Sequence, residues 1–543
     1  MKKPFAITLD VGTSMANHTG GWRTSRPVYV DRLPPCNDAC PAGENIQAWL
    51  YHAESGDYRR AWELLVEENP LPAIMGRACY HPCEGACNRG SLDAAVGIHS
   101  VERFLGDLAI REGWALPRPA PATGRRVLVI GAGPSGLSAA YHLARLGHAV
   151  TLREAAPQAG GMMRFGIPRY RLPRDVLDAE IRRILDLGVT LELSARVDDI
   201  PAAMAEGGFS ACFAAIGAHL AKRVDIPASD ANRIVEAIGF LAGAAKDEEP
   251  PRVGRRVVVY GGGNTALDAA RTARRLGADE AVIVYRRTEQ HMPAHPSELA
   301  EALEEGVTVR WLRTVKHMGE GEITVEKMTI GPDGRAVPTG ELETIAGDTL
   351  VLALGQDVDL DPLVRIPGVE VTRYVSIAVA PDLMTGFPGL FCGGDMVPGE
   401  RTITVAAGHG KKAARNIDAY LRGEPREPKA RHPLARFDLL NTWYYTDCDR
   451  SVQPVLDDAR RQRTFAEVHG GLDEATAQLE ARRCLSCGNC FECDNCFGVC
   501  PDNAVVKLGP GLRFRFDYDF CKGCGLCAKE CPCGAIEMVP EET

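Results

Sequence analysis

Short apolar runs alternate with helix-period segments through the middle of the chain. The run Val127–Ile130 leads into a glycine-rich turn and a helical pattern, and the next apolar run ends at Glu154. A second unit with the same order covers Arg255–Thr288. Strands that alternate with helices are typical of a parallel α/β sheet. The pattern therefore predicts a multidomain α/β protein with two Rossmann-like dinucleotide-binding domains.

The first unit carries the fingerprint Gly131-x-Gly133-x-x-Gly136 between its strand and its helix. Gly131 permits the tight turn, Gly133 lets the backbone approach a pyrophosphate, and Gly136 lets helix and strand pack closely. The pyrophosphate is expected at the helix N-terminus, where free N–H groups and the dipole favour negative charge. Glu154 follows where an acid accepts hydrogen bonds from a ribose. The complete unit therefore predicts a dinucleotide site.

The second unit has the related fingerprint Gly261-x-Gly263-x-x-Ala266. Its second strand ends in Arg286 and Arg287 rather than in an acid. Arginine at this place pairs with a 2′-phosphate, which favours NADP over NAD. The alternative is that these arginines form only surface ion pairs.

Charge and cysteine content narrow the class of protein. The chain has 543 residues, a formal net charge of −10 and nineteen cysteines. A nucleic-acid-binding surface is normally basic, no apolar run approaches the roughly 20 residues of a spanning helix, and Asp10 interrupts a signal-like start. We therefore expect a cytoplasmic protein whose cysteines bind metal. The stretch Leu9–Gly20 resembles the phosphate loop of sugar kinases, but we find no second phosphate loop and interpret it as an N-terminal arm packed on the body.

Eleven of the cysteines lie between Cys484 and Cys533. They include two copies of the run C-x2-C-x2-C-x3-C-P, in which the fourth cysteine ligates the other cluster of a two-cluster ferredoxin. Zinc is an alternative for a C-x2-C pair, but the doubled run favours two [4Fe–4S] clusters in a bacterial ferredoxin-like α+β domain. One cluster is expected on Cys490, Cys493, Cys496 and Cys531, and the other on Cys521, Cys524, Cys527 and Cys500.

Several motifs in one order resemble a known family. The strings "NPLPAIMGRACYHPCEGACNRG", "GGMMRFGIP", "GGGNTALD" and "YRRTEQHMP" are similar to the glutamate synthase small subunit and its relatives. The resemblance implies FAD in the first unit and NAD(P)H in the second, which is inserted in the first, with a return strand at Val351–Gln356. No side-chain constellation for acyl, phosphoryl or glycosyl chemistry stands out in the sequence, so we nominate no proton-transfer catalyst. The further nucleotide contacts expected are Gly161, Asn264, Thr265, Gly355, Gly394, Asp395 and Thr404.

The resemblance also implies a helical N-terminal domain with two [4Fe–4S] clusters. This chain has only five cysteines there, which are Cys36, Cys40, Cys79, Cys83 and Cys87. In the family a C-x2-C pair, usually within "RCLxCG", stands shortly before the position of Cys36. Here that string occurs instead at Arg483–Gly488.

Our hypothesis is that this pair has moved in sequence but not in space. The first cluster is then held by Cys36, Cys87, Cys484 and Cys487. The second is held by Cys40, Cys79, Cys83 and Glu102, the acid of "HSVERF", because the family uses a glutamine or glutamate there. The chain then carries four clusters. The alternative is that Cys484 and Cys487 are unligated, or form a zinc or redox pair. Buried or incidental thiols are expected at Cys212, Cys392, Cys448 and Cys533.

Proline-rich joints at Trp114–Gly124 and Arg422–Pro433 separate these parts. We expect an N-terminal arm and helical iron–sulfur domain over 1–118 and an FAD-binding domain over 125–224 and 346–425. An NAD(P)H-binding domain is expected over 225–345, a linker over 426–483, and a two-cluster ferredoxin-like domain over 484–543.

The order of the redox cofactors predicts an electron-transfer path from NAD(P)H through FAD and the N-terminal clusters to the ferredoxin-like tail, because flavin accepts the two electrons of a hydride and passes them on one at a time. The leading hypothesis is an NAD(P)H:acceptor oxidoreductase that serves a larger complex, such as a 2-oxoacid:acceptor oxidoreductase. Its partners are then other subunits or a ferredoxin. Alternatives are a glutamate synthase small subunit, a free-standing NADPH:ferredoxin oxidoreductase, or the flavoprotein partner of dissimilatory sulfite reductase. A non-catalytic iron–sulfur scaffold or redox sensor is a further alternative, against which both intact nucleotide units argue.

Overall fold

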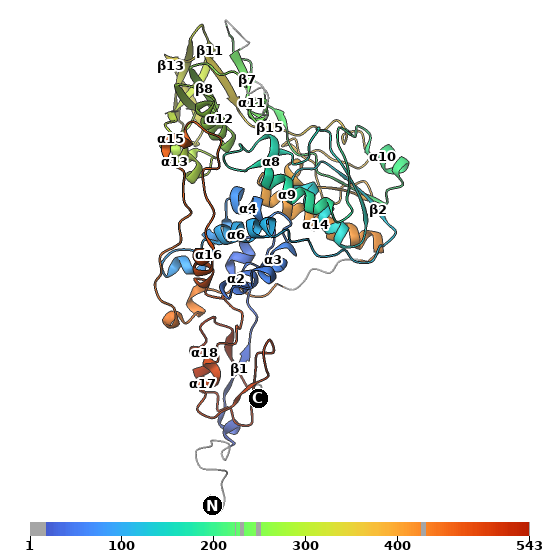
Figure 1. The fold of residues 1–543 in the computed structure, drawn as a ribbon, viewed down its shortest axis with the longest axis vertical. Helices are drawn as coiled ribbons and strands as arrows, with labels where there is room; N and C mark the ends of the chain where they lie inside the picture. The colour runs from blue at the N-terminus through green and yellow to red at the C-terminus, as the bar shows by residue number, and fades with distance from the viewer. Residues whose placement is uncertain (1–17, 223, 229–232, 246–250, 425–430, 542–543) are drawn as a thin grey trace, which may run out of the picture.

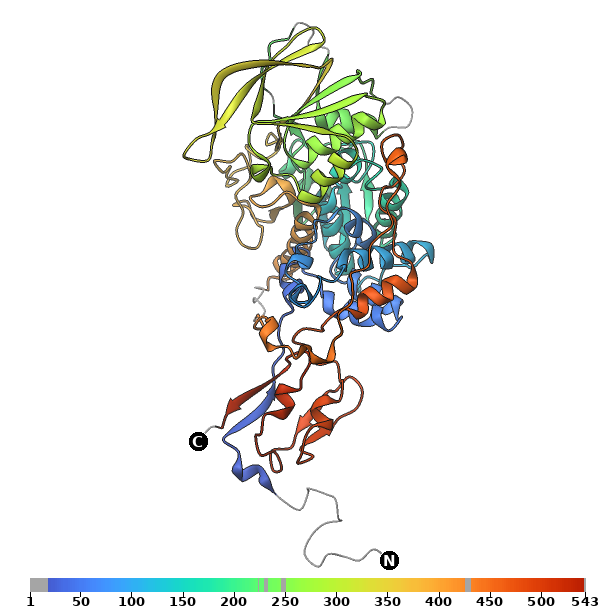
Figure 2. The same ribbon diagram turned by 90° about the vertical axis from the view of Figure 1, so that its left-hand side faces the viewer.

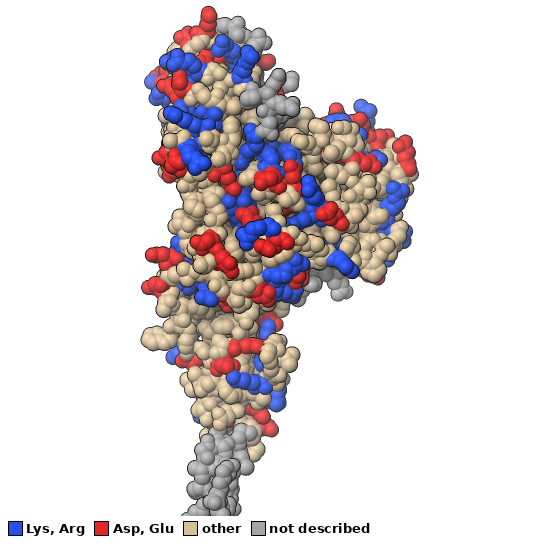
Figure 3. Space-filling model, viewed as in Figure 1, with Lys and Arg blue, Asp and Glu red and all other residues tan. Residues whose placement is uncertain are grey.

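The computed structural model describes residues 18–222, 224–228, 233–245, 251–424 and 431–541. Figure 1 shows an elongated molecule with a helical domain at its centre, one sheet domain above it, another sheet domain to its right and a small C-terminal module below it. Acidic and basic side chains are interspersed over the face seen in Figure 3. No helix in the described part of the chain combines the length and apolar character that crossing a bilayer requires.

The first sheet is parallel and has the strand order β16-β5-β2-β3-β4. The buried residues of its central strands β2 and β5 are all apolar. Helices α7 and α14 pack against one another beside the sheet. The strands are β2 (Arg126–Ile130), β3 (Ala149–Arg153), β4 (Thr190–Glu192), β5 (Ala211–Ala214) and β16 (Leu390–Cys392). The helices are α7 (Pro134–Arg145), α8 (Met162–Phe165), α9 (Arg174–Leu185), α10 (Ile200–Gly207) and α14 (Ile403–Arg422).

The second sheet is also parallel, with the order β10-β9-β8-β14-β7. An antiparallel sheet of β11, β12 and β13 extends from it. The parallel strands are β7 (Ile234–Glu236), β8 (Arg256–Gly261), β9 (Glu280–Tyr285), β10 (Thr308–Trp311) and β14 (Thr349–Ala353), and the antiparallel strands are β11 (Arg313–Met318), β12 (Glu322–Ile330) and β13 (Ala336–Ala346). The helices are α11 (Ala237–Ala244), α12 (Asn264–Arg275) and α13 (Pro296–Glu304).

The pairing of β14 corrects one expectation. The stretch Val351–Gln356 was expected to return to the first sheet, but β14 pairs with β7 and β8 of the second sheet. The strand that completes the first sheet is β16, which pairs with β5. The chain crosses back next to the short ladder of β15 (Gln356–Asp357) and β6 (Leu220–Ala221). The return therefore begins after β14, later than the expected boundary at residue 346.

The helical domain is built around the close crossing of α4 and α6. A Cβ added at Gly76 of α4 would lie 2.5 Å from the Cα of Arg103, and one at Gly106 of α6 would lie 2.4 Å from the backbone N of Ala73. Helix α16 belongs to the same core, because its Ala477 and Ala481 pack with the α2 and α6 side chains. The helices are α1 (Pro35–Ala39), α2 (Ile46–Glu54), α3 (Tyr58–Val66), α4 (Pro72–Ala78), α5 (Pro82–Gly85), α6 (Ile98–Arg111) and α16 (Glu474–Arg482).

The C-terminal module includes a strand from the other end of the chain. Strand β1 (Ser25–Tyr29) pairs antiparallel with β19 (Ile536–Pro540), so that Tyr29 lies opposite Ile536. The arm expected at Leu9–Gly20 lies mostly outside the described residues, and its Gly20 N donates to Asp519 O at 2.9 Å. The module also contains α17 (Asn495–Gly498), β17 (Val505–Lys507), β18 (Phe514–Phe516) and α18 (Leu526–Lys529).

Residues 446–473, which we call the strap, run from the helical domain to the second sheet domain and back (Figure 2). The strap contains helix α15 (Asp458–Arg461). Arg275 Nε of α12 donates to Thr464 O at 3.1 Å, and Val468 N donates to Tyr170 O at 2.9 Å. Glu467 pairs with Arg77 of the helical domain at 2.7 Å. The strap therefore ties three domains together.

Candidate functional site

A cavity of about 520 Å³ lies between the two sheet domains. This volume is within the range of roughly 300–1,000 Å³ that is usual for cofactor and ligand sites. Both nucleotide-binding units contribute to its wall. The expected site residues that line it are Gly131, Gly133, Glu154, Gly161, Asn264, Thr265, Gly394 and Asp395.

The glycine loop before α7 leaves room for a phosphate. Gly131 has φ +98°, and a Cβ there would lie 2.4 Å from Ala215 O. A Cβ at Gly136 would lie 1.8 Å from Gly131 O, so this glycine lets the helix approach the turn. Next to Gly133 the nearest atom is Gly161 Cα, at 3.9 Å from an added Cβ. The open side of Gly133 and the N-terminus of α7 therefore fit a pyrophosphate.

Two carboxylates from different elements, those of Glu154 and Asp395, line the cavity. Glu154 follows β3, and its side chain accepts hydrogen bonds from Ala132 N at 2.7 Å and Ala156 N at 2.8 Å. Asp395 lies in the short helix η6 (Gly394–Met396), and burial raises its pKa while Arg401 opposes the rise. Both positions match those expected for contacts to ribose and to the ribityl–pyrophosphate chain of FAD.

The second nucleotide unit points its helix α12 toward the same cavity. Asn264 and Thr265, the first residues of α12, line the wall, and Asn264 Oδ1 accepts from His295 N at 2.8 Å. Arg286 is exposed beyond the end of β9. Arg287 Nε is buried and has no hydrogen-bond partner within the described residues. A buried Nε–H without a hydrogen-bond partner at this place fits a 2′-phosphate better than the alternative of a surface ion pair.

The cavity wall also contains residues that the sequence did not nominate. Arg171 NH1 donates to both carboxylate oxygens of Asp268, at 3.0 and 2.9 Å, and Arg171 also pairs with Glu298. Tyr80 of the helical domain stacks on His295 of the second sheet domain, with ring centroids 4.8 Å apart. These contacts join the helical domain, the first sheet domain and the second sheet domain at one edge of the cavity.

Other expected nucleotide contacts lie beside the cavity rather than in its wall. The backbone positions Gly136, Gly261, Gly263 and Ala266 shape the two turns, and Gly355 lies on the crossing between the sheets. Thr404, expected at the flavin, lies buried at the start of α14, and its Oγ1 donates to Cys79 Sγ at 3.0 Å. Ala78 and Tyr80, which flank Cys79, do line the wall. The cavity and Cys79 are therefore immediate neighbours.

The structure brings together four sets of side chains, which we call groups A to D. Group A is Cys40, Cys79, Cys83 and Glu102; group B is Cys36, Cys87, Cys484 and Cys487; group C is Cys490, Cys493, Cys496 and Cys531; and group D is Cys500, Cys521, Cys524 and Cys527. Each set matches one expected from the sequence, including the two that combine distant segments.

Group A lies in the buried centre of the helical domain. Burial raises the pKa of Cys79 to about 12, with a contribution from the nearby charge of Glu102. Glu102 Oε1 accepts from Asn69 Nδ2 at 2.9 Å. The same Nδ2 donates at 2.9 Å to Glu44, a second buried acid that was not predicted from the sequence. Burial and then the charge of Glu44 raise the pKa of Cys40. Trp49 Nε1 holds the other oxygen of Glu44 at 3.3 Å.

In group B the cysteine pair of "RCLSCG" lies beside two cysteines of the N-terminal domain. Cys36, Cys87, Cys484 and Cys487 line one small cavity. Burial and then the charges of Cys484, Cys87 and Cys487 raise the pKa of Cys36. Asn88 Nδ2 donates to Cys487 Sγ at 3.4 Å. Such a set of mutually repelling thiolates is suited to a cation.

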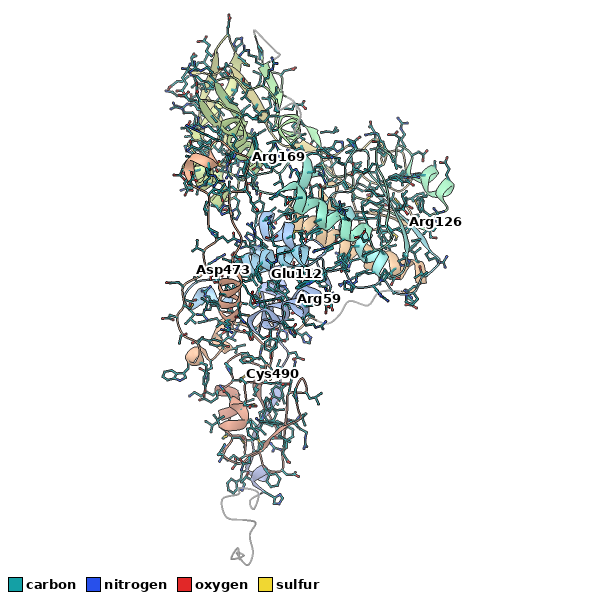
Figure 4. All side chains as sticks on the ribbon, in the orientation of Figure 1. Arg59, Glu112, Arg126, Arg169, Asp473 and Cys490 are labelled. Atoms are coloured by element: carbon teal, nitrogen blue, oxygen red, sulfur yellow. The ribbon has the colours of Figure 1, made fainter. Side chains whose placement is uncertain are left out.

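Groups C and D combine the two ferredoxin runs in the crossed manner. The pKa of Cys490 is raised by burial and by the charge of Cys531 from the second run. That of Cys521 is raised by burial and by Cys500 from the first run. Figure 4 places Cys490 at the end of the C-terminal module that faces the helical domain.

Tyr445 lies between groups B and C. Its pKa is raised by burial and then by the charges of Cys533, Cys484, Cys487 and Cys493. Its hydroxyl donates to Leu485 O at 3.1 Å. Groups A and B both take residues from the segments of α1 and α5, and the pKa of Cys527 in group D is raised by burial and then by charges that include Cys496 of group C. The groups therefore follow one another from the cavity as A, B, C and D.

Of the four remaining cysteines, Cys212, Cys392 and Cys533 are buried, and Cys448 is partly exposed. Cys533 is buried, as expected, and its Sγ lies 3.7 Å from Cys531 Sγ. The hydrogen bond between the two lowers the pKa of Cys531.

Comparisons with known proteins place this arrangement in a family. Residues 125–410 match the pyridine nucleotide-disulphide oxidoreductase family. Residues 23–114 match the family of dihydropyrimidine dehydrogenase domain II with its 4Fe–4S cluster, and residues 514–537 match the 4Fe–4S binding domain. The chain belongs to the pyridine nucleotide-disulphide oxidoreductase family and joins its fold to two iron–sulfur domains.

Three relatives illustrate the range of this family. The NADP(+)-dependent formate dehydrogenase subunit beta of Moorella thermoacetica is 36% identical over 83% of this chain and 70% of that protein. The NADPH-Fe(3+) oxidoreductase subunit beta of Geobacter sulfurreducens is 32% identical over 84% and 76%. The glutamate synthase [NADPH] small chain of Azospirillum brasilense is 32% identical over 73% and 88%.

These findings confirm the resemblance to the glutamate synthase small subunit and the expected fold class. The protein is an NAD(P)H-dependent flavin and iron–sulfur oxidoreductase, with FAD, NADP and 4Fe–4S clusters as its cofactors.

Proposed function

We propose that this chain is the NADPH-oxidising electron-transfer subunit of a larger oxidoreductase, and that groups A to D each hold one [4Fe–4S] cluster. When bound, FAD exchanges a hydride with the nicotinamide and single electrons with the clusters. The observation that carries the proposal is the unbroken order of the cavity and groups A, B, C and D. The beta-subunit names of two relatives support a partner subunit. The 2-oxoacid oxidoreductase partner stays a prediction.

The chain's own residues have separable roles in this proposal. The loop at Gly133 and the N-terminus of α7 take the FAD pyrophosphate, and Glu154 binds its ribose. The second unit binds NADPH, with Arg287 on the 2′-phosphate. The N-terminus of α14 points toward the cavity, where its dipole favours negative charge. Thr404, in the first turn of α14, contacts the group A ligand Cys79.

Group A is the entry point for electrons because its ligand Cys79 lies between two residues of the cavity wall. Burial of the group excludes water from it, and the carboxylate of Glu102 is held by Asn69. Group D lies farthest along the order, and its ligand Cys524 is exposed. We infer that a protein partner exchanges electrons with the protein at the C-terminal module.

Stopped-flow spectroscopy under anaerobic conditions tests this route. In the parent protein, NADPH should bleach the flavin and then the cluster absorbance, and should support reduction of methyl viologen. In Cys79→Ser, the flavin should still be bleached by NADPH while cluster reduction is lost. Cys212→Ser is the control, because this thiol is buried in β5 of the first sheet.

Two results would contradict the proposal. A flavin-replete parent that reduces no viologen with NADPH would favour the scaffold or sensor alternative. Cluster reduction in Cys79→Ser at the rate of the parent would remove group A from the route.

A further inference from the structure

Group C receives a hydroxyl from the opposite end of the chain. The Oη of Tyr29 in β1 lies 3.6 Å from Cys496 Sγ. Tyr29 is held there by the pairing of β1 with β19 and by stacking on Phe516, with ring centroids 5.0 Å apart. The geometry is thus fixed by the fold of the module rather than by a mobile side chain.

A thiol that is not one of the expected ligands also lies next to group C. Cys533 is 2% exposed, and its Sγ lies 3.7 Å from Cys531 Sγ. The bend after Pro532 keeps it in place, because Gly488 N donates to Cys533 O at 2.6 Å. Ala535 N also reaches Cys531 Sγ, at 3.4 Å. Two side chains thus approach two different sulfur ligands of the same group.

Cluster binding fixes the direction of both hydrogen bonds. A cysteine that ligates iron is a thiolate and has no proton to donate. Tyr29 O–H and Cys533 S–H must then be the donors, to Cys496 and Cys531 respectively. A hydrogen bond to a ligand sulfur offsets negative charge and favours the reduced, more negative form of a cluster.

We propose that Tyr29 and Cys533 are positioning residues that raise the reduction potential of the group C cluster above the value that its four ligands alone would give. This inference rests on the proposed assignment of a cluster to group C. Backbone amides supply hydrogen bonds in both groups, at Cys490 and Cys493 of group C and at Cys521, Cys527 and Cys500 of group D. The two side-chain donors act on group C in addition to these amides.

Redox titration of the full-length, cluster-replete protein, followed by low-temperature EPR, tests the proposal. The group C signal is identified as the one that changes in Cys493→Ser. Tyr29→Phe and Cys533→Ala should each shift the group C potential to a more negative value, and the double variant should shift it further. The group D potential should stay closer to that of the parent in all three.

The controls remove a hydroxyl or a thiol without removing a donor to sulfur. Tyr518 donates its hydroxyl to Pro27 O at 2.8 Å at the same β1 interface, so Tyr518→Phe tests the packing of the arm alone. Cys212→Ala removes a buried thiol far from the module. Both should leave the group C potential unchanged.

The outcomes separate this inference from the proposed function. If Tyr29→Phe and Cys533→Ala keep the parent's clusters and the group C potential does not move, the inference is wrong and the proposed function stands. If Cys493→Ser changes no cluster signal, group C holds no cluster and both fail. Should Tyr29→Phe lose the arm, Cys533→Ala alone decides, because Cys533 directly follows the second ferredoxin run and belongs to the C-terminal segment itself.

Discussion

Glu305 connects the strap to the second sheet domain through a buried ion network. Its carboxylate accepts two hydrogen bonds from Arg271, at 2.9 and 2.7 Å, and two from Arg275, at 2.6 and 2.9 Å. Arg461 of the strap lies 3.4 Å from the same group, and Glu305 is 1% exposed. Substitution of Glu305 by glutamine keeps the shape but leaves these arginines without their shared charge.

Removal of one partner from a buried ion pair costs about 3–5 kcal/mol. Arg271 keeps Glu301 at 2.8 Å and Arg461 keeps Glu304 at 3.0 Å, so the lower end, about 3 kcal/mol, applies here. At roughly 2–4 °C for each kcal/mol, the melting temperature of this domain should fall by about 6–12 °C. The strap should loosen at the same time, because Arg461 loses a partner.

Differential scanning calorimetry checks this value, and the transition of the second domain is recognised because NADP+ shifts it. Glu343→Gln is the matched control: this acid pairs with Arg313 at 2.6 Å near the surface, where a pair contributes about 1 kcal/mol or less. Burial alone would raise the pKa of Glu305, but hydrogen bonds from Arg275 and Arg271 hold it below its usual value.

The depressed pKa gives the sign of the pH dependence. The stabilisation by Glu305 is fully present above the unfolded pKa of glutamate, about 4.3, and is lost as the pH falls through the lower folded value. The difference between the parent and Glu305→Gln should therefore shrink in acid. A variant that melts with the parent at neutral pH would refute the role given to this network.

Three further substitutions test single contacts. Arg287→Ala should raise the KM for NADPH about 10- to 150-fold, because a charged hydrogen bond contributes roughly 1.5–3 kcal/mol, and should have little effect on the KM for NADH. Arg286→Ala should change the KM for NADPH less. Equal effects of Arg287→Ala on both cofactors in steady-state kinetics would contradict this assignment. Thr404→Val removes the donor to Cys79, so redox titration should give a more negative group A potential, and an unchanged potential would exclude the contact. Glu102→Ala should remove one cluster signal from the EPR spectrum of the reduced protein, and a spectrum like that of the parent would show that another group is the ligand.

The features predicted from sequence are those that short segments determine. The turn at Gly131, Gly133 and Gly136 needs particular backbone freedom within six residues, so its sequence is diagnostic. The x3-Cys-Pro ends of the ferredoxin runs fix which cysteines are equivalent. The structure therefore has the glycine turn and the two cysteine runs at the positions that the sequence indicated.

The features that the sequence did not reveal depend on long-range contacts. The pair of Arg171 with Asp268, the stack of Tyr80 on His295 and the ladder of β1 with β19 each join segments about a hundred residues or more apart. No local pattern marks such partners. The strand at Val351–Gln356 was misassigned for the same reason, because apolar character predicts a strand but not the sheet that it enters.

The cysteines at Cys484 and Cys487 show what family resemblance added. Spacing alone left them unpaired next to the first ferredoxin run, and only the string "RCLSCG" connected them with Cys36 and Cys87. Glu44 is the opposite case: it lies beside Glu102, yet nothing in its sequence context distinguished it from an ordinary acid.

The central claim is that four clusters form one route, with group B built from both ends of the chain. Iron and sulfide analysis of Cys484→Ser, combined with EPR of the reduced protein, tests it most directly. The account predicts the loss of about four irons per chain and of one cluster signal, together with slower electron transfer from NADPH to the C-terminal clusters. Cys448→Ser, which changes a cysteine outside all four groups, should lose neither. A Cys484→Ser protein with the full iron content and every cluster signal of the parent would contradict the account.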